Sequence, residues 1–142
     1  MSFRTRRIVE FRDTDAAGIV HFSAFFPWME SAEHEMLRTA GIEVLPDFSK
    51  HADSVTWPRV SVRCDYSNAA RFEDWLEISV SVSEIGRSSV HYSIDFTRET
   101  KDGEFVRVAA GKTVVVCCRL RPGGGLEKVP IPAEIRAKLE SI

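Results

Sequence analysis

One segment of the chain has helical periodicity, and nearly everything after it has the periodicity of strands. Apolar residues recur at steps of three and four from Phe25 to Ala40, with charged residues between them. Ser23 can cap this helix, and Gly41 can end it. With no second long helix to pack against, the apolar stripe has to be buried on a sheet. The pattern predicts an α+β fold built around one long central helix.

The strand pattern is that of an antiparallel sheet. Polar and apolar residues alternate with a period of two in most of these segments, which is typical of strands with one face in water. Asp102-Gly103 is a strong hairpin signal before the last of them. We therefore expect a curved antiparallel sheet of about five strands wrapped around the helix. The predicted strands are residues 3–12, 60–66, 76–83, 90–96 and 105–120.

The remaining segments are shorter and more polar. Residues 42–56 are predicted to form a loop, with His51 in it, and residues 132–142 a short terminal helix. Gly111 lies inside the last strand, where it can mark a β-bulge. No repeat or linker divides the chain, so a single domain spanning residues 1–142 is expected.

Charge and cysteine usage exclude several classes of protein. The formal net charge of the 142 residues is −2, which gives no basic field to attract nucleic acid or an anionic membrane. No apolar run reaches membrane-spanning length, and the N-terminal residues lack the apolar core of a signal peptide. Cys64, Cys117 and Cys118 are an odd number and are expected to be free thiols. These features favour a cytoplasmic location.

The segment before the helix, DTDAAGIVHFSAFF, combines acidic residues with a small-residue turn and an aromatic helix start. Asp15 is expected to be ionised, and a carboxylate can act as a nucleophile or as a base that activates water. The start of a helix supplies unpaired N–H groups that can stabilise an oxyanion. The alternative is that Asp15 only holds the turn, as Asp13 is expected to do.

Residues Asp13–Glu33 resemble the signature D-x-D-x-x-G-I/V-V/I of the 4-hydroxybenzoyl-CoA thioesterase-like hotdog family. The resemblance extends along nearly the whole chain and includes the segments TWPRVSVRCDY and GRSSV. It implies a hotdog fold, in which the sheet wraps the central helix, and subunits that pair as a homodimer or assemble as a homotetramer. It also implies active sites at the dimer interface.

Site residues follow from the resemblance position by position. Asp15 corresponds to the catalytic carboxylate, and the backbone N–H of Phe22 or Ser23 to the group that polarises the thioester carbonyl. Many relatives have a polar pair where this chain has His21-Phe22, so any contribution of the second side chain to substrate handling is lost here or moved to His21. The expected substrate-binding residues are Gly18, His21, Phe25, Trp57, Pro58, Tyr66, Arg87, Ser88 and Ser89. The last three would meet the phosphates of coenzyme A.

Glu30 lies on the helix beyond Phe26, where it can face the pocket and orient water or substrate, or can simply face solvent. In some hotdog thioesterases a helix acid is catalytic, so Glu30 and Glu33 are the substitutes if Asp15 is not. The sequence has no His-Glu-x-x-His motif, and no metal is expected. No cofactor is expected either, since coenzyme A is part of the substrate.

These observations predict an enzyme that hydrolyses a short-chain or aromatic acyl-CoA thioester to the free acid and coenzyme A. Two alternatives stay open. A hotdog hydratase or dehydratase would need a histidine and an acid around a 3-hydroxyacyl chain, and a non-catalytic module would bind acyl-CoA without cleaving it.

Overall fold

The computed structural model describes residues 2–49 and 54–142. Residues 50–53, which include His51 and belong to the predicted loop, lie outside the described residues. Five strands form an antiparallel sheet in the order β1-β4-β5-β6-β3. The strand number and the antiparallel pairing agree with the prediction from sequence. The strands are β1 (Phe3–Ile8), β3 (Arg59–Tyr66), β4 (Trp75–Ile85), β5 (Ser89–Glu99) and β6 (Phe105–Val116).

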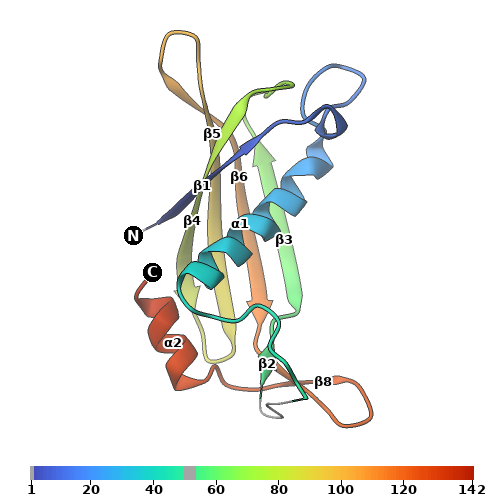
Figure 1. Ribbon diagram of the computed structural model, residues 1–142, viewed down its shortest axis with the longest axis vertical. Coiled ribbons are helices and arrows are strands. Elements are labelled where there is room, and N and C mark those ends of the chain that lie inside the picture. The colour runs from blue at the N-terminus through green and yellow to red at the C-terminus, as the bar shows by residue number, and fades with distance from the viewer. Residues whose placement is uncertain (1, 50–53) are drawn as a thin grey trace.

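The long helix α1 (Phe25–Thr39) crosses one face of this sheet (Figure 1). The predicted apolar stripe is buried there because residues three and four apart share one side of a helix. One member of the buried face is charged. The side chain of Glu33, which the periodicity placed among the polar residues, is only 2% exposed. The buried residues of α1 are Phe25, Trp28, Met29, Ala32, Glu33, Met36 and Leu37.

The start of the helix differs from the prediction. A 3₁₀ turn, η2 (Phe22–Ala24), precedes α1, and its N-cap is His21, whose ring nitrogen accepts the Ser23 N–H. Ser23 lies inside this turn, so the expectation that it caps the helix is wrong. The histidine side chain provides the acceptor that a serine was expected to provide.

The predicted long last strand is broken. β6 ends at Val116, because the Cys117 N–H turns to the Ser88 carbonyl at 2.6 Å. The chain continues in a second, three-stranded sheet that sequence reasoning missed, with order β2-β7-β8. Its short strands and the other short elements are β2 (Val55–Thr56), β7 (Cys118–Leu120), β8 (Leu126–Lys128), η1 (Phe11–Asp13) and α2 (Ala133–Glu140).

Gly111 does not form the predicted bulge. It stays in register with Cys64 on one side and Ile94 on the other. A Cβ atom at this position would lie 2.5 Å from the terminal methyl carbon of Met29. The glycine is therefore explained by the close approach of the helix to the sheet, which needs a strand position without a side chain.

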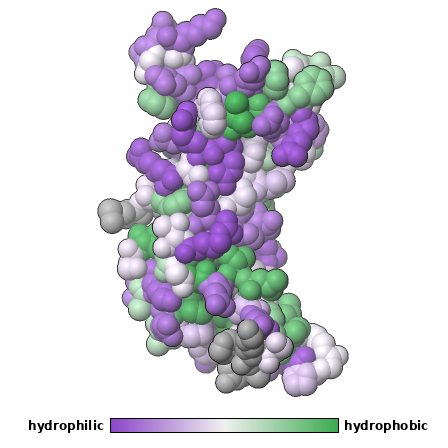
Figure 2. Space-filling view, viewed as in Figure 1, coloured by the Kyte–Doolittle hydropathy of each residue, from purple (hydrophilic) through white to green (hydrophobic). Residues whose placement is uncertain are grey.

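The two ends of the subunit are different. The start of α1 and the end of β3 lie at one end, and the β4–β5 hairpin and the start of β3 lie at the other (Figure 1). Figure 2, seen from the helix side, shows apolar side chains gathered toward both ends of this face, with a polar middle between them. Within the described residues, no helix is long and apolar enough to cross a membrane.

β3 is an edge strand, and it lacks the alternation of wet and dry residues that its sequence predicts. Val60 is 61% exposed, Val62 41% and Tyr66 47%. Val62 pairs with Thr113 of β6, whose side chain is buried. The exposed side chains of β3 therefore lie along the border of the sheet face that α1 covers.

Candidate active site

The segment that carries both N-terminal acids folds as two successive turns. Asp13 holds the first turn, since its carboxylate accepts the Glu10 N–H at 2.9 Å and its carbonyl accepts the His21 N–H at 2.8 Å. This is the structural role expected from the sequence. Asp15 is half-buried, and its Oδ1 accepts the Ala17 N–H at 2.9 Å. In the part of the chain that the structure describes, no hydrogen bond engages Oδ2 of Asp15.

The helix start offers one free donor near this carboxylate. The Ser23 N–H is taken by His21 Nδ1 at 3.2 Å, and the Ala24 N–H by the His21 carbonyl at 2.9 Å. The Phe22 N–H opens η2, where a helix has no internal acceptor for its first donors. Among the described residues, no backbone carbonyl outside the helix accepts the Phe22 N–H. Of the two predicted oxyanion donors, the geometry favours Phe22.

A cleft of about 340 Å³ joins these groups. Asp15 and Phe22 line it together with Phe25 of α1 and Tyr66 at the end of β3. The Tyr66 hydroxyl donates to the Phe22 carbonyl at 2.9 Å and so ties the strand to η2. Burial of the hydroxyl, together with the neighbouring Cys64 and Asp65, raises the pKa of Tyr66 to about 12. The remaining lining residues are Ile19, Val20, Ser67, Asn68, Ala69 and Ala70.

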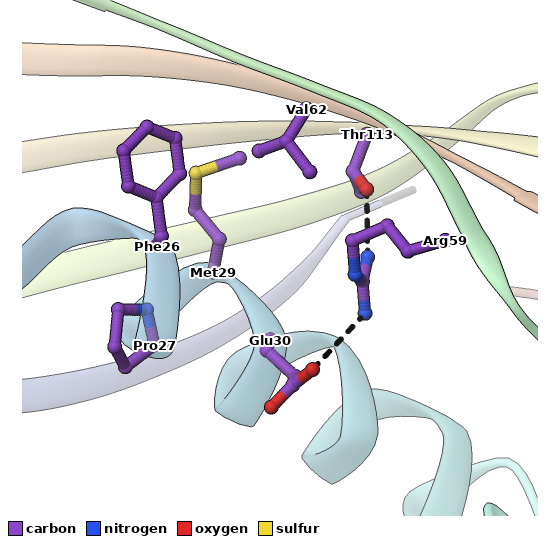
Figure 3. Close-up of a pocket in the computed structure, with 7 residues that line it drawn as sticks. All are labelled: Phe26, Pro27, Met29, Glu30, Arg59, Val62 and Thr113. Carbon is purple, nitrogen blue, oxygen red and sulfur yellow. Dashed lines mark hydrogen bonds and ion pairs between the residues drawn. The ribbon is translucent and has the colours of Figure 1, made fainter. Parts of the chain in front are cut away.

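A second groove, of about 240 Å³, lies farther along α1, between the helix and β3 (Figure 3). Its apolar wall consists of Phe26, Pro27, Met29 and Val62. Across from this wall, the guanidinium of Arg59 reaches toward the helix (Figure 3). The groove is therefore apolar on one side and charged on the other.

Arg59 is fixed by a network of buried groups. It makes two hydrogen bonds to Glu33, at 2.8 and 3.1 Å, and one of 2.6 Å to the Thr113 hydroxyl. Its other neighbour is the exposed carboxylate of Glu30, at 3.7 Å. Burial lowers the pKa of Arg59, but the hydrogen bonds and charge of Glu33, with the charge of Glu30, raise it more. One arginine facing two carboxylates leaves the groove with a formal charge of about −1.

Comparison with known proteins identifies the family of this chain. The family model of the thioesterase-like superfamily matches residues 9–139. This chain belongs to the thioesterase-like superfamily. The match spans nearly the whole chain.

Individual members of the superfamily align over their full length. The 1,4-dihydroxy-2-naphthoyl-CoA hydrolase of Synechococcus elongatus is 26% identical, over 97% of this chain and 95% of its own. The structure of a gentisyl-coenzyme A thioesterase is 26% identical with a TM-score of 0.75, covering 96% of this chain and 99% of the other. The 4-hydroxybenzoyl-CoA thioesterase of Pseudomonas sp. strain CBS-3 shares the fold, with a TM-score of 0.83 at 23% identity over 96% and 98% of the two chains.

The predicted site residues of this thioesterase-like chain separate into two groups. One group is at the cleft, which is lined by Asp15, Phe22, Phe25 and Tyr66. Gly18, His21 and Ser23 belong to the same segment of the chain as Asp15 and Phe22. The other group lies at the opposite end of the subunit, beside the β4–β5 hairpin and the start of β3 (Figure 1). In that group Ser88 is buried, at 6% exposed, and Arg87 is exposed. The residues concerned are Trp57, Pro58, Arg87, Ser88 and Ser89.

The two helix acids also separate. Glu30 lines the groove and is exposed, as expected of a residue that can meet a substrate. Glu33 is buried in its pair with Arg59, which makes it a poor substitute for Asp15. Among the described residues, no cluster of three or more histidine, cysteine or acidic side chains could hold a metal ion.

Sequence reasoning missed two parts of this site. The Arg59 network joins residues that are 26 and 54 positions apart, so no local pattern signals it. The cleft wall formed by residues 67–70 was also missed. Its signal was a short run of small and polar residues directly after a strand that ends in an aromatic residue.

Proposed function

We propose that this chain hydrolyses an acyl-CoA thioester to the free acid and coenzyme A, with Asp15 as nucleophile or general base. The observation that carries the proposal is the arrangement in one cleft of a half-buried carboxylate with an unengaged oxygen and a helix-start N–H without an acceptor. A negative oxygen can attack or activate water, and the amide can stabilise the charge that develops on the thioester oxygen.

The two roles of Asp15 differ in which bond it forms. As a nucleophile, its oxygen bonds to the acyl carbon, the C–S bond breaks, and coenzyme A leaves as a thiolate. Water then hydrolyses the resulting anhydride and restores the carboxylate. As a general base, Asp15 takes a proton from water while the water oxygen bonds to the acyl carbon and the thiolate leaves. The Phe22 amide serves the oxyanion in both schemes.

An aromatic acyl group is favoured over a short aliphatic one. The cleft is lined by Phe22, Phe25 and Tyr66, and aromatic side chains bind a planar apolar group well. Two relatives that are more than 25% identical act, by their names, on dihydroxynaphthoyl- and gentisyl-CoA. We further propose that the acyl group extends from the cleft into the groove along α1, where the Glu30 carboxylate can accept a hydrogen bond from one of its substituents.

We also propose that the protein is at least a homodimer, formed by pairing of the free β3 edges. An open edge strand with exposed Val60 and Val62 is a ready template for another strand. In a two-fold antiparallel pairing, the Arg59 end of one copy lies beside the Tyr66 end of the other. This would bring Trp57, Pro58 and the groove of one subunit toward the Asp15 cleft of its partner. Val62→Lys should then yield monomers in sedimentation equilibrium.

The location proposed is the cytoplasm. All three cysteines are free thiols. Cys64 lies on the edge strand β3, in register with Gly111, and Cys117 is buried. Unpaired cysteines of this kind fit a reducing compartment.

The test of the function is a thiol-release screen with CoA thioesters of different chain length and aromaticity. The wild type should release coenzyme A from aromatic thioesters. Asp15→Asn, which keeps the shape of the side chain, should lower kcat by about 10² to 10⁴. Asp13→Asn is the matched control within the same segment and should lower kcat far less. Equal activity of wild type and Asp15→Asn would refute the role of Asp15.

Two other results would change the function itself. Calorimetric binding of CoA esters without thiol release would favour the non-catalytic module. Hydration of an enoyl-CoA, with no thiol released, would favour the hydratase.

A further inference from the structure

The peptide between Phe22 and Ser23 is held at both of its polar atoms by side chains. The Tyr66 hydroxyl donates to the Phe22 carbonyl at 2.9 Å, and His21 Nδ1 accepts the Ser23 N–H at 3.2 Å. These two atoms belong to one rigid peptide plane. Two side chains, one from β3 and one from the loop before η2, therefore fix the orientation of that plane.

The preceding peptide plane is fixed as well. Its carbonyl, that of His21, accepts the Ala24 N–H at 2.9 Å. The His21 N–H, which belongs to the peptide before it, donates to the Asp13 carbonyl at 2.8 Å and anchors the chain there. In a trans peptide the Phe22 N–H points away from the His21 carbonyl. The direction of the free Phe22 N–H is thus set by its neighbours on both sides, although this group makes no bond itself.

Tyr66 is the one member of this set that comes from the sheet. It is paired with Ala109 of β6, so its backbone is part of the five-stranded sheet. Its ring packs on Phe25, with ring centroids 5.2 Å apart. A phenol with an elevated pKa keeps its proton, so it remains a donor. The hydroxyl therefore links the rigid sheet to the short 3₁₀ turn.

We propose that Tyr66 is a positioning residue, whose hydroxyl holds the Phe22 amide in the direction needed for the oxyanion. The proposal rests on the proposed function. Without the hydroxyl, η2 keeps its sequence and its aromatic contacts but loses its tie to β3. The amide then has to be oriented during the reaction, which weakens its interaction with the transition state more than the binding of substrate. The loss should appear in kcat and not in KM.

The experiment compares Tyr66→Phe with the wild type on the best thioester of the screen. The only other tyrosine, Tyr92, is buried in β5 outside the cleft, so Tyr92→Phe is a matched control for the loss of a phenol hydroxyl. We expect kcat of Tyr66→Phe to fall by about tenfold, a fraction of the loss of a whole oxyanion donor. KM should stay within about twofold, and Tyr92→Phe should match the wild type in kcat.

A second pair of variants tests the other end of the same peptide. Asn is a good N-cap residue and can accept the Ser23 N–H in place of His21, whereas Ala cannot. His21→Asn should therefore retain more of the wild-type kcat than His21→Ala. Circular dichroism would reveal whether Tyr66→Phe fails to fold. In that case the two His21 variants still test whether the orientation of this peptide sets kcat.

The possible failures can be told apart. A wild type that releases no thiol from any thioester overturns the proposed function and this inference with it. An active wild type whose kcat is unaffected by Tyr66→Phe overturns the positioning role alone. A rise in KM with unchanged kcat would also overturn it, because Tyr66 would then act in substrate binding.

Discussion

Asp15 and Glu33 are both acids close to the central helix, and the structure gives them opposite surroundings. The Asp15 carboxylate is half-buried and accepts one local backbone hydrogen bond. The Glu33 carboxylate is 2% exposed, and both of its oxygens are bonded to Arg59. One side chain retains a free oxygen in a cleft, and the other is neutralised within the core.

The comparison shows how the surroundings of the carboxylate proposed to react differ from those of one that stabilises the fold. A buried charge has to be paired, since leaving it unpaired costs several kcal/mol. Pairing removes the lone pairs that chemistry would use. Asp15 avoids both conditions because its turn keeps it near solvent and because, among the described residues, its carboxylate accepts a hydrogen bond only from the Ala17 N–H.

The largest predicted effect is on stability, and it comes from a substitution that breaks the buried pair of Glu33 and Arg59. Glu33→Ala leaves the Arg59 guanidinium without its bidentate partner, so the free energy of unfolding should fall by about 3–5 kcal/mol. Urea denaturation measures this. Asp15→Asn, which leaves no buried charge unpaired, should change the free energy of unfolding by less than about 1 kcal/mol. If the two variants were equally stable, the contrast between the two acids would be lost.

A smaller loss of stability is predicted for Gly111→Ala. The added Cβ would meet the Met29 methyl at 2.5 Å, directly beneath the groove. Overpacking of this kind costs about 1–3 kcal/mol, which denaturant unfolding can resolve. Met29→Ala made in the same chain should recover part of the loss, because it removes the clashing atoms. A cost that persists unchanged in the double variant would point to the backbone instead.

The charged side of the groove predicts a change of selectivity. With Glu30 and Glu33 facing one arginine, an acyl group that carries a free carboxylate should be disfavoured. Glu30→Gln should raise kcat/KM for such a thioester, relative to its neutral analogue, by about threefold to tenfold at low salt. The ratio should change less at high salt, since Glu30 is exposed.

Glu134→Gln provides the control for that measurement. Glu134 is exposed on α2 and paired with Lys138. It is distant in sequence from the residues that line the groove. Its substitution removes the same charge but should leave the ratio unchanged. A ratio that shifts equally in both variants would indicate a general effect of net charge.

The smallest effect concerns the stability of the cleft at alkaline pH. Burial of the hydroxyl, together with the neighbouring Cys64 and Asp65, raises the pKa of Tyr66 from its ordinary value of 10.0 to about 12, so the folded state holds this proton when the unfolded state has lost it. This contribution to stability is complete below pH 10 and is lost as the pH rises through about 12. Tyr66→Phe should therefore lose less stability than the wild type over that range in urea titrations.

Much of the architecture was readable from the chain. The three- and four-residue spacing of α1 and the alternation in β4 and β5 determined which faces are buried, because periodicity reports a local geometry. The same local signals placed Asp15 before a helix start. They located β3 but not its exposure, since an edge strand shows the alternation of a core strand while lacking a layer to cover it.

Residues whose roles depend on distant partners were beyond the reach of local patterns. Glu33 looked like a solvated helix position, and its burial follows only from Arg59 and Thr113 on other strands. Ser23 looked like a cap, but His21 took that role.

The amino-acid sequence by itself determined the long helix, the five main strands and the acidic turn at the helix start, because these depend on neighbours within a few residues. Only the tertiary structure decided which acid is paired, which amide is left free and which tyrosine holds the adjoining peptide. Those outcomes depend on the packing of a helix on a sheet, which brings together side chains that are tens of residues apart.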